Sequence, residues 1–128
     1  MTKRSKNDPD VFLTIPTKKL EESLKFYTTI LGFKLSQRLE RPGGVVLAFL
    51  SKGEFMLEFV LNPNIPAGEV GTFAPILSFH VSNLTEILAT LSEAGIQPPQ
   101  PNERPGGVTI LGFKDPNGVP IHFVTGER

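Results

Sequence analysis

Apolar and polar residues alternate along much of this chain in the two-residue period that is typical of β-strands. The stretch Gly53–Leu61, GEFMLEFVL, shows the pattern most clearly. Successive residues of a strand point to opposite faces, so Glu58 shares a face with Met56 and Val60. A carboxylate between two apolar side chains either binds a ligand or is a buried charge that needs a partner.

The same reading predicts the order strand, helix, strand, strand, strand in each half of the chain. The first half has strands at Val11–Pro16, Phe33–Glu40, Val45–Ser51 and Gly53–Leu61, and a helix at Leu20–Leu31. The second has strands at Ile76–Val81, Val108–Phe113 and Val119–Val124, an irregular edge strand within Gln97–Arg104, and a helical stripe at Leu84, Ile87, Leu88 and Leu91. Gly32 and Gly95 end the two helices, and Asn83 with Glu86 can form a reciprocal helix cap.

The two halves are copies of one another. The hexapeptide ERPGGV occurs at Glu40–Val45 and again at Glu103–Val108, and Leu57–Val60 aligns with Ile121–Val124. The sequence therefore predicts an α+β fold of two tandem βαβββ modules, with a curved mixed sheet around a cleft and the helices outside. The modules span residues 11–61 and 76–125 of a single domain, after a tail at 1–10. Residues 62–75 are a linker or a loop that folds over a pocket.

Composition narrows the possible functions. The 13 basic and 13 acidic residues balance, which disfavours a nucleic-acid or membrane-surface binder, although a basic arm at 1–10 is an alternative to a mobile tail. No signal-peptide core or long apolar run is present, so we expect a cytoplasmic protein. The absence of cysteine excludes disulfides and zinc–thiolate sites, and any metal would need His and carboxylate ligands.

Three segments carry a family resemblance, LEESLKFYTTILGFKL at Leu20–Leu35, FHVSNLTEILATLSEAGI at Phe79–Ile96 and GFKDPNGVPIHFV at Gly112–Val124. They resemble the vicinal oxygen chelate superfamily, which includes glyoxalases, bleomycin resistance proteins and extradiol dioxygenases. The resemblance implies paired βαβββ modules that enclose a ligand cleft, and often a homodimer. Because one fold hosts many activities, it says less about the reaction.

In the metal-dependent members, each module supplies one ligand from its first strand and one from its last. The corresponding positions look like Phe12, Glu58, Ile76 and His122. Only Glu58 and His122 can coordinate a metal, whereas divalent sites of this kind use about three or more protein ligands. The resemblance therefore implies that the usual metal site is lost; a divalent metal, if one binds, would use Glu58 and His122.

Strand alternation predicts the lining of the cleft. The helix-covered face would carry Leu13, Ile15, Leu57, Phe59, Leu77, Phe79, Val81, Ile121 and Phe123. The opposite face would carry Phe12, Thr14, Met56, Glu58, Val60, Ile76, Ser78, His80, His122 and Val124. A mostly apolar surface with a few polar groups is typical of small-molecule sites.

Several polar residues have two readings. Glu58 and His122 would transfer protons near neutral pH if they meet, or they form a structural pair that orients a ligand. His80 lies four residues from the Ile76 position, about 13 Å along a strand, so it is expected at the rim of the cleft as a ligand contact or a structural histidine. Arg41 and Arg104 occupy equivalent turns, where they would bind an anionic group or remain solvated.

Three hypotheses follow. The first is a metal-independent protein, similar to the bleomycin resistance branch, that binds a small apolar or aromatic molecule and forms a homodimer. The second is a divergent lyase, isomerase or dioxygenase-type enzyme that uses Glu58 and His122, with or without a divalent metal. The third is a scaffold without a ligand. The depleted ligand set favours the first, and the polar groups on the cleft face weigh against the third.

Overall fold

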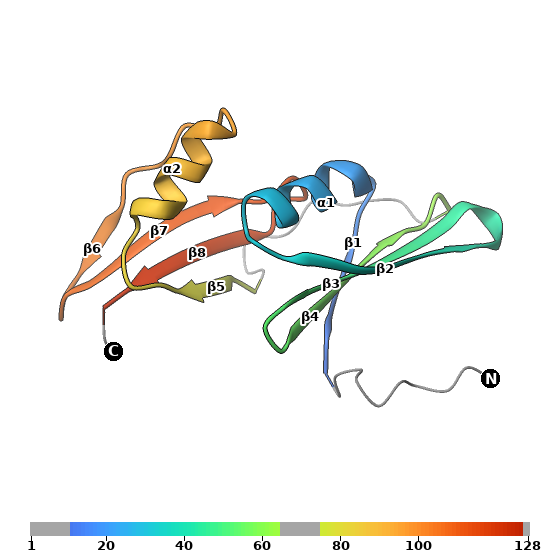
Figure 1. Ribbon diagram of the computed structural model, residues 1–128, viewed down its shortest axis with the longest axis horizontal. Coiled ribbons are helices and arrows are strands. Elements are labelled where there is room, and N and C mark those ends of the chain that lie inside the picture. Colours follow the sequence, from blue (N-terminus) through green and yellow to red (C-terminus); the bar gives the residue numbers. More distant parts are fainter. Residues whose placement is uncertain (1–10, 65–74, 127–128) are drawn as a thin grey trace. The chain divides into compact units, whose positions relative to one another are not determined.

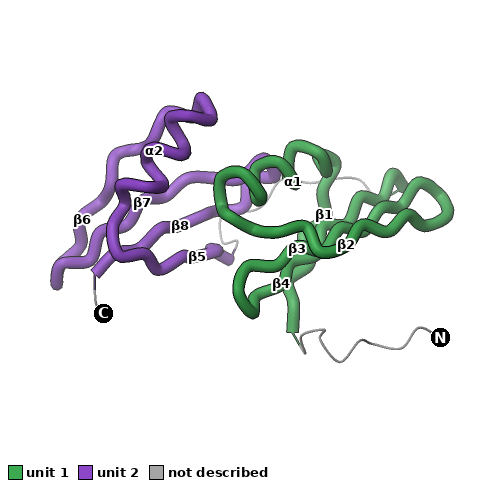
Figure 2. The backbone as a smooth tube through the Cα atoms, viewed as in Figure 1, with its two compact units in different colours: residues 1–67 green, residues 68–128 purple. Residues whose placement is uncertain are grey.

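The structure is a computed structural model that describes residues 11–64 and 75–126. The tail predicted at 1–10 and most of the linker predicted at 62–75 lie outside the described residues. The chain divides into two compact units, Met1–Ala67 and Gly68–Arg128, coloured separately in Figure 2. Each unit contains one copy of the predicted repeat.

The described part of unit one contains a four-stranded sheet and one helix. Its elements are β1 (Leu13–Pro16), α1 (Leu20–Thr29), β2 (Lys34–Arg41), the short 3₁₀ turn η1 (Pro42–Gly44), β3 (Val45–Lys52) and β4 (Phe55–Leu61). The strand order is β1-β4-β3-β2, and β1 runs parallel to β4 while the other pairs are antiparallel. The parallel pair follows from α1, because a helical crossover returns the chain to the same end of the sheet.

Unit two repeats this arrangement. Its elements are β5 (Leu77–His80), α2 (Thr85–Glu93), β6 (Asn102–Arg104), β7 (Val108–Lys114) and β8 (Pro120–Thr125). The strand order β5-β8-β7-β6, with β5 parallel to β8, matches that of unit one (Figure 1). The predicted α+β fold of two βαβββ modules is therefore confirmed.

Local boundaries differ from the predicted ones at the ends of the helices. Helix α1 stops at Thr29, and Leu31 and Phe33 donate backbone hydrogen bonds to Phe26 and Tyr27 as the chain turns through Gly32. Gly32 has φ of 79°, the left-handed conformation that the sequence led us to expect there.

At the start of α2 the predicted reciprocal cap is reduced to one bond. The Asn83 side chain accepts the Thr85 N–H at 3.0 Å, while Leu84 occupies the N-cap position. Asn83 therefore lies one residue too early for Glu86 to complete the reciprocal pair.

The helix-facing side of each sheet forms a core of aromatic and aliphatic side chains. In unit one Tyr27 of α1 is fully buried, and its ring lies 4.9 Å from that of Phe59 on β4. In unit two the ring of Phe123 stacks on Phe79 and Phe113 at 4.9 and 5.9 Å. The predicted alternation is thus confirmed for the central strands.

Burial weakens away from these central strands. Leu13, predicted on the helix-covered face, is 39% exposed at the beginning of edge strand β1. Leu77, Phe79 and Val81 of unit two are only half-buried. Val124 shows the reverse difference: it lies on the face opposite the helix, yet it is buried.

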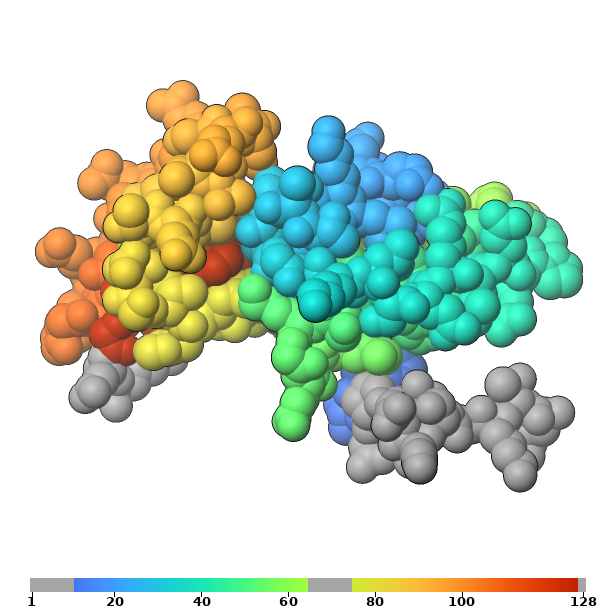
Figure 3. Space-filling view, viewed as in Figure 1, coloured from blue at the N-terminus to red at the C-terminus, as the bar shows by residue number. Residues whose placement is uncertain are grey.

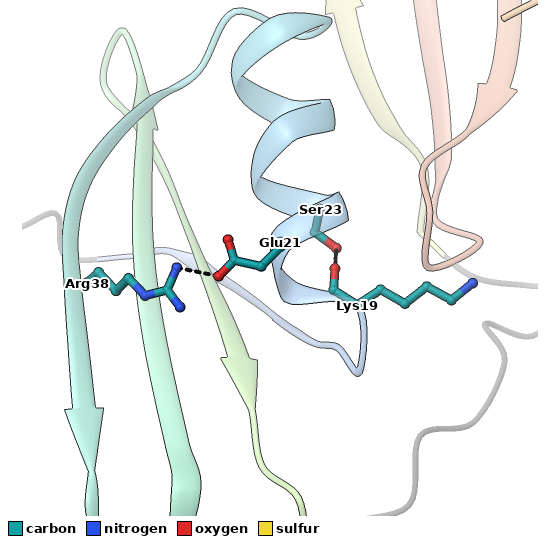
Figure 4. A network of polar contacts seen from close by, with 4 residues as sticks. All are labelled: Lys19, Glu21, Ser23 and Arg38. Atoms are coloured by element: carbon teal, nitrogen blue, oxygen red, sulfur yellow. Dashed lines mark hydrogen bonds and ion pairs between the residues drawn. The ribbon is translucent and has the colours of Figure 1, made fainter.

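An ion pair joins α1 to the edge of its sheet. Arg38 of β2 forms an ion pair with Glu21 of α1 at 2.6 Å, and Ser23 donates a hydrogen bond to the Lys19 carbonyl (Figure 4). Both members of the ion pair are solvent-accessible, and Figure 3 shows β2, in cyan, at the surface beside the blue helix.

Neither helix in the described part of the chain is long and apolar enough to cross a membrane.

Candidate functional site

Glu58 lies in the middle of the sheet face that α1 leaves uncovered. The strand register places Thr14 of β1 and Phe49 of β3 directly opposite Glu58, and Gln37 of β2 opposite Phe49. We call these four residues the Glu58 row. Directly opposed residues of neighbouring strands point to the same face, so the row brings together side chains from all four strands of unit one.

The Glu58 carboxylate is held by a neutral donor. The Thr14 hydroxyl donates a hydrogen bond of 2.8 Å to Glu58 Oε1. Glu58 itself is half-buried, and no other bond to its carboxylate occurs among the described residues. The hydrogen bond orients the carboxylate but leaves its charge uncompensated, so the second oxygen is available to a ligand.

Aromatic and thioether side chains border the carboxylate. Phe12, which precedes β1, is 46% exposed, and its ring meets that of Phe49 edge to face with centroids 6.4 Å apart. Met56 is half-buried two residues before Glu58 on β4. The predicted lining residues of the first module therefore share one face, and Phe49 adds to them.

His122 occupies the corresponding place in unit two. Ser78 of β5 and Gly112 of β7 lie directly opposite it, and we call these three residues the His122 row. His122 is half-buried, while Ser78 is exposed. Ile76, one residue before β5, is 51% exposed, as Phe12 is exposed before β1.

Gly112 makes room for the imidazole. A Cβ atom at this position would lie 3.2 Å from His122 Cδ2 and 3.3 Å from Nε2, closer than ordinary contact. All the other glycines in the described part of the chain have positive φ, so Gly112 is the exception. Glycine at this position therefore leaves space for the His122 ring, and it does not serve an unusual backbone conformation.

His80 is anchored to the backbone. Its Nε2 donates to the Gly126 carbonyl at 2.9 Å, and the residue is exposed at the end of β5. Because Ser78 is the register partner of His122, His80 lies two residues beyond that partner on the same face. This contact gives His80 a structural role that does not depend on a ligand.

The two predicted arginines lie far from the centre of each row. Arg41 pairs with Val45 and Arg104 with Val108, at the exposed ends of β2 and β6. Val45 is four residues from Phe49 along β3, or about 13 Å at the usual strand rise. The structure therefore does not bring Arg41 next to Glu58, and the same spacing separates Arg104 from Gly112.

Three residues of the rows were missed in the sequence: Phe49, Gln37 and Gly112. Their places depend on which residues pair across β2–β3 and β7–β8, which local alternation does not reveal. The duplication held a usable signal, because the ERPGGV repeat aligns Phe49 with Gly112. Glu58 and His122 lie in different units, and the pairing expected between them stays a prediction.

The donor set can be tested against the metal that the resemblance implies. Of the four corresponding positions, Phe12 and Ile76 present hydrocarbon, and Glu58 and His122 present one carboxylate and one imidazole. The described residues contain no group of three or more His, Asp or Glu side chains arranged to hold an ion. Such divalent sites use about three protein ligands, and these positions offer two. These residues therefore do not fit the usual metal.

A family model now identifies the fold. The model described as the Glyoxalase/Bleomycin resistance protein/Dioxygenase superfamily matches residues 11–123. The chain belongs to this superfamily. The match extends over both modules and both rows, and it agrees with the resemblance carried by the three sequence segments.

Named relatives and solved structures are similar to this chain over more than four fifths of their length. A lactoylglutathione lyase of Escherichia coli O157:H7 is 30% identical in an alignment of 112 positions that covers 82% of this chain and 83% of that protein. A glyoxalase family protein from Enterococcus faecalis superposes with a TM-score of 0.71 at 23% identity, covering 89% of this chain and 93% of that one. The fosfomycin resistance protein FosX from Mesorhizobium loti gives 0.70 at 14% identity, with 94% and 93% coverage. The two structures show the shared fold.

Proposed function

We propose that this superfamily member binds a small, largely apolar or aromatic molecule on the faces that carry Glu58 and His122, without the usual divalent metal. The observation that carries the proposal is the chemistry of the four metal positions, where Phe12 and Ile76 present hydrocarbon. Exposed apolar side chains beside a few oriented polar groups are what a small-molecule site requires. The Thr14 hydrogen bond supports this reading, because it gives the carboxylate an orientation that needs no ion.

The metal part of the proposal is tested by restoring the missing donors. Wild-type protein purified without chelator should bind nickel, zinc or manganese weakly and without fixed stoichiometry. The double variant Phe12→His, Ile76→His should bind one ion per site, because four donors would then replace two. Stoichiometric binding by the wild type that His122→Ala abolishes would refute metal independence.

The ligand part is tested by a thermal-shift screen of apolar and aromatic compounds. A ligand at 100 times its dissociation constant should stabilise the native state by roughly 2.7 kcal/mol. The affinity of true hits should fall in Phe12→Ala and in Glu58→Gln. Glu54→Gln, which removes a charge from the exposed turn before β4, should leave their affinity unaltered. A complete screen without hits would argue for a scaffold.

A divergent lyase or isomerase is the second candidate, and the names of the relatives favour it. Glu58 and His122 would act as acid and base if they meet across a substrate. The test is to follow formation and cleavage of lactoylglutathione, the compound in the relatives' name, with and without added divalent metal. Turnover that is lost in both Glu58→Gln and His122→Asn would favour this candidate over simple binding.

We further propose a cytoplasmic homodimer. The superfamily membership supports the dimer. Light scattering of the purified chain should give twice the 14.0 kDa of one chain. A monomer at micromolar concentration would remove the dimer from the proposal, and secretion of the tagged protein would remove the cytoplasmic location.

A further inference from the structure

Glu58 is a charged group among uncharged neighbours. The residues around it on this face are Thr14 and Phe49 opposite, Met56 and Val60 along β4, and Pro16, Leu47 and Ser51 diagonally. The basic residues that the register places on the same face, Lys34 and Arg41, belong to β2, two strands away. No described base forms an ion pair with Glu58.

A half-buried carboxylate in this setting attracts a positive charge from outside. The Thr14 hydroxyl is a neutral donor, so it satisfies one lone pair of Oε1 and leaves the net charge in place. An alcohol can also donate a charge-assisted hydrogen bond to the carboxylate, but a cationic donor adds the Coulomb attraction between opposite charges. A ligand ammonium or guanidinium group would therefore gain more from this position than an alcohol of the same shape.

The aromatic rings beside Glu58 favour the same charge. Phe49 is directly opposite Glu58, and Phe12 packs on Phe49 while leaving 46% of its surface exposed. The electron-rich faces of aromatic rings attract organic cations, and the rings also cover the apolar body that carries the charge. The carboxylate and its aromatic neighbours thus favour a ligand that has both a positive charge and an apolar body.

Unit two lacks this combination. Its equivalent positions carry His122 in place of Glu58 and Gly112 in place of Phe49, so neither the negative charge nor the ring is repeated. The feature is therefore specific to the Glu58 row and does not follow from the duplicated fold.

From these observations we infer that the Glu58 row and Phe12 bind an organic cation, an ammonium or guanidinium group on an apolar or aromatic body. The inference rests on the proposed function and names the class of its ligand. Thr14 orients the carboxylate, Glu58 pairs with the cationic group, and Phe12 and Phe49 cover the body of the ligand. One carboxylate and the Thr14 hydroxyl together offer few ligands to an inorganic divalent ion, so this site differs from a metal centre.

The test uses three probes of nearly the same shape and different charge: 2-naphthylmethylammonium, 2-naphthylmethanol and 2-naphthoate. Titration calorimetry with the full chain should show the ammonium binding at least about tenfold more tightly than the alcohol, since the ammonium adds Coulomb attraction to its hydrogen bond. The naphthoate should bind most weakly. The preference for the ammonium should shrink as salt concentration rises.

Two acid-to-amide variants separate the site charge from the overall charge. Glu58→Gln should lower ammonium affinity by about 10- to 100-fold and alcohol affinity by far less. Glu54→Gln removes the same charge from the exposed turn before β4 and should change neither value by more than about twofold. Thermal unfolding of both variants checks that they fold, and the probe series on wild-type protein gives an answer even if Glu58→Gln does not.

The outcomes distinguish this inference from the proposed function. Equal affinity for ammonium and alcohol, or equal effects of the two glutamine variants, would overturn the cation assignment and leave small-molecule binding standing. Saturable binding of the ammonium by two chains at one shared site would keep the cation assignment and add a second copy to it. No binding of any probe would overturn both the inference and the proposed apolar site.

Discussion

The contact between Gly112 and His122 allows the position of one side chain to be changed without removing it. In Gly112→Ala the new Cβ would meet two imidazole atoms at 3.2 and 3.3 Å, against about 3.5–4.0 Å for comfortable packing. The ring must therefore move away by a few tenths of an ångström or change rotamer. Because Gly112 has no positive φ, alanine fits the backbone there without strain.

The expected change in stability is small. Replacing glycine by alanine restricts the unfolded chain and stabilises the fold by about 0.4–1 kcal/mol. Crowding a half-buried ring that can turn toward solvent costs on the order of 0.5–1.5 kcal/mol, the range of an off-rotamer side chain. The two contributions nearly cancel, so the free energy of unfolding should change by less than about 1 kcal/mol.

Imidazole NMR signals report the displacement directly. The sequence contains two histidines, so His122→Asn assigns the pair and His80 serves as an internal reference. Gly112→Ala should shift the His122 signals, leave those of His80 in place, and weaken any ligand that contacts His122. Unchanged His122 signals with unchanged binding would refute the idea that this glycine exists to make room for the ring.

Three further predictions concern the support of the site. Thr14→Val should lower the affinity of ligands that depend on Glu58 by severalfold in calorimetry. The free energy of unfolding should change by less than about 1 kcal/mol, because the variant removes one exposed hydrogen bond. An unaltered affinity would contradict the orienting role of Thr14. Tyr27→Ala should lower the free energy of unfolding in urea by about 3–5 kcal/mol, since the ring is fully buried, and a loss below 1 kcal/mol would contradict its place in the core. Arg38→Ala should cost less than about 1 kcal/mol, because its partner Glu21 is 73% exposed, and a larger loss that persists in high salt would show that the ion pair was underestimated.

Much of the fold was accessible from local patterns. The repeat of ERPGGV revealed the duplication, and the alternation around Glu58 placed Leu57 and Phe59 in the core, where the structure buries both fully. The predictions from these features are correct because strand alternation and turn chemistry depend on neighbouring residues. The superfamily resemblance added the expected layout of the modules.

The missing parts depend on residues far apart in the chain. Thr14 and Glu58 are 44 residues apart, and only the parallel register of β1 with β4 makes them partners. Phe49 likewise joins the site through its pairing with Glu58, although its own stretch of sequence shows nothing but an apolar strand. Periodicity defines which face a side chain occupies, whereas its neighbours on that face come from register.

The exchange of Phe49 for Gly112 has a consequence for how the ancestral repeat has been used. A freshly doubled gene offers the same surface twice, and a molecule that fits one copy fits the other equally. In the first copy Phe49 lies beside Glu58, and in the second copy Gly112 leaves space beside the His122 ring. The two halves now present chemically different surfaces, so selection can act on each without disturbing the scaffold that they share.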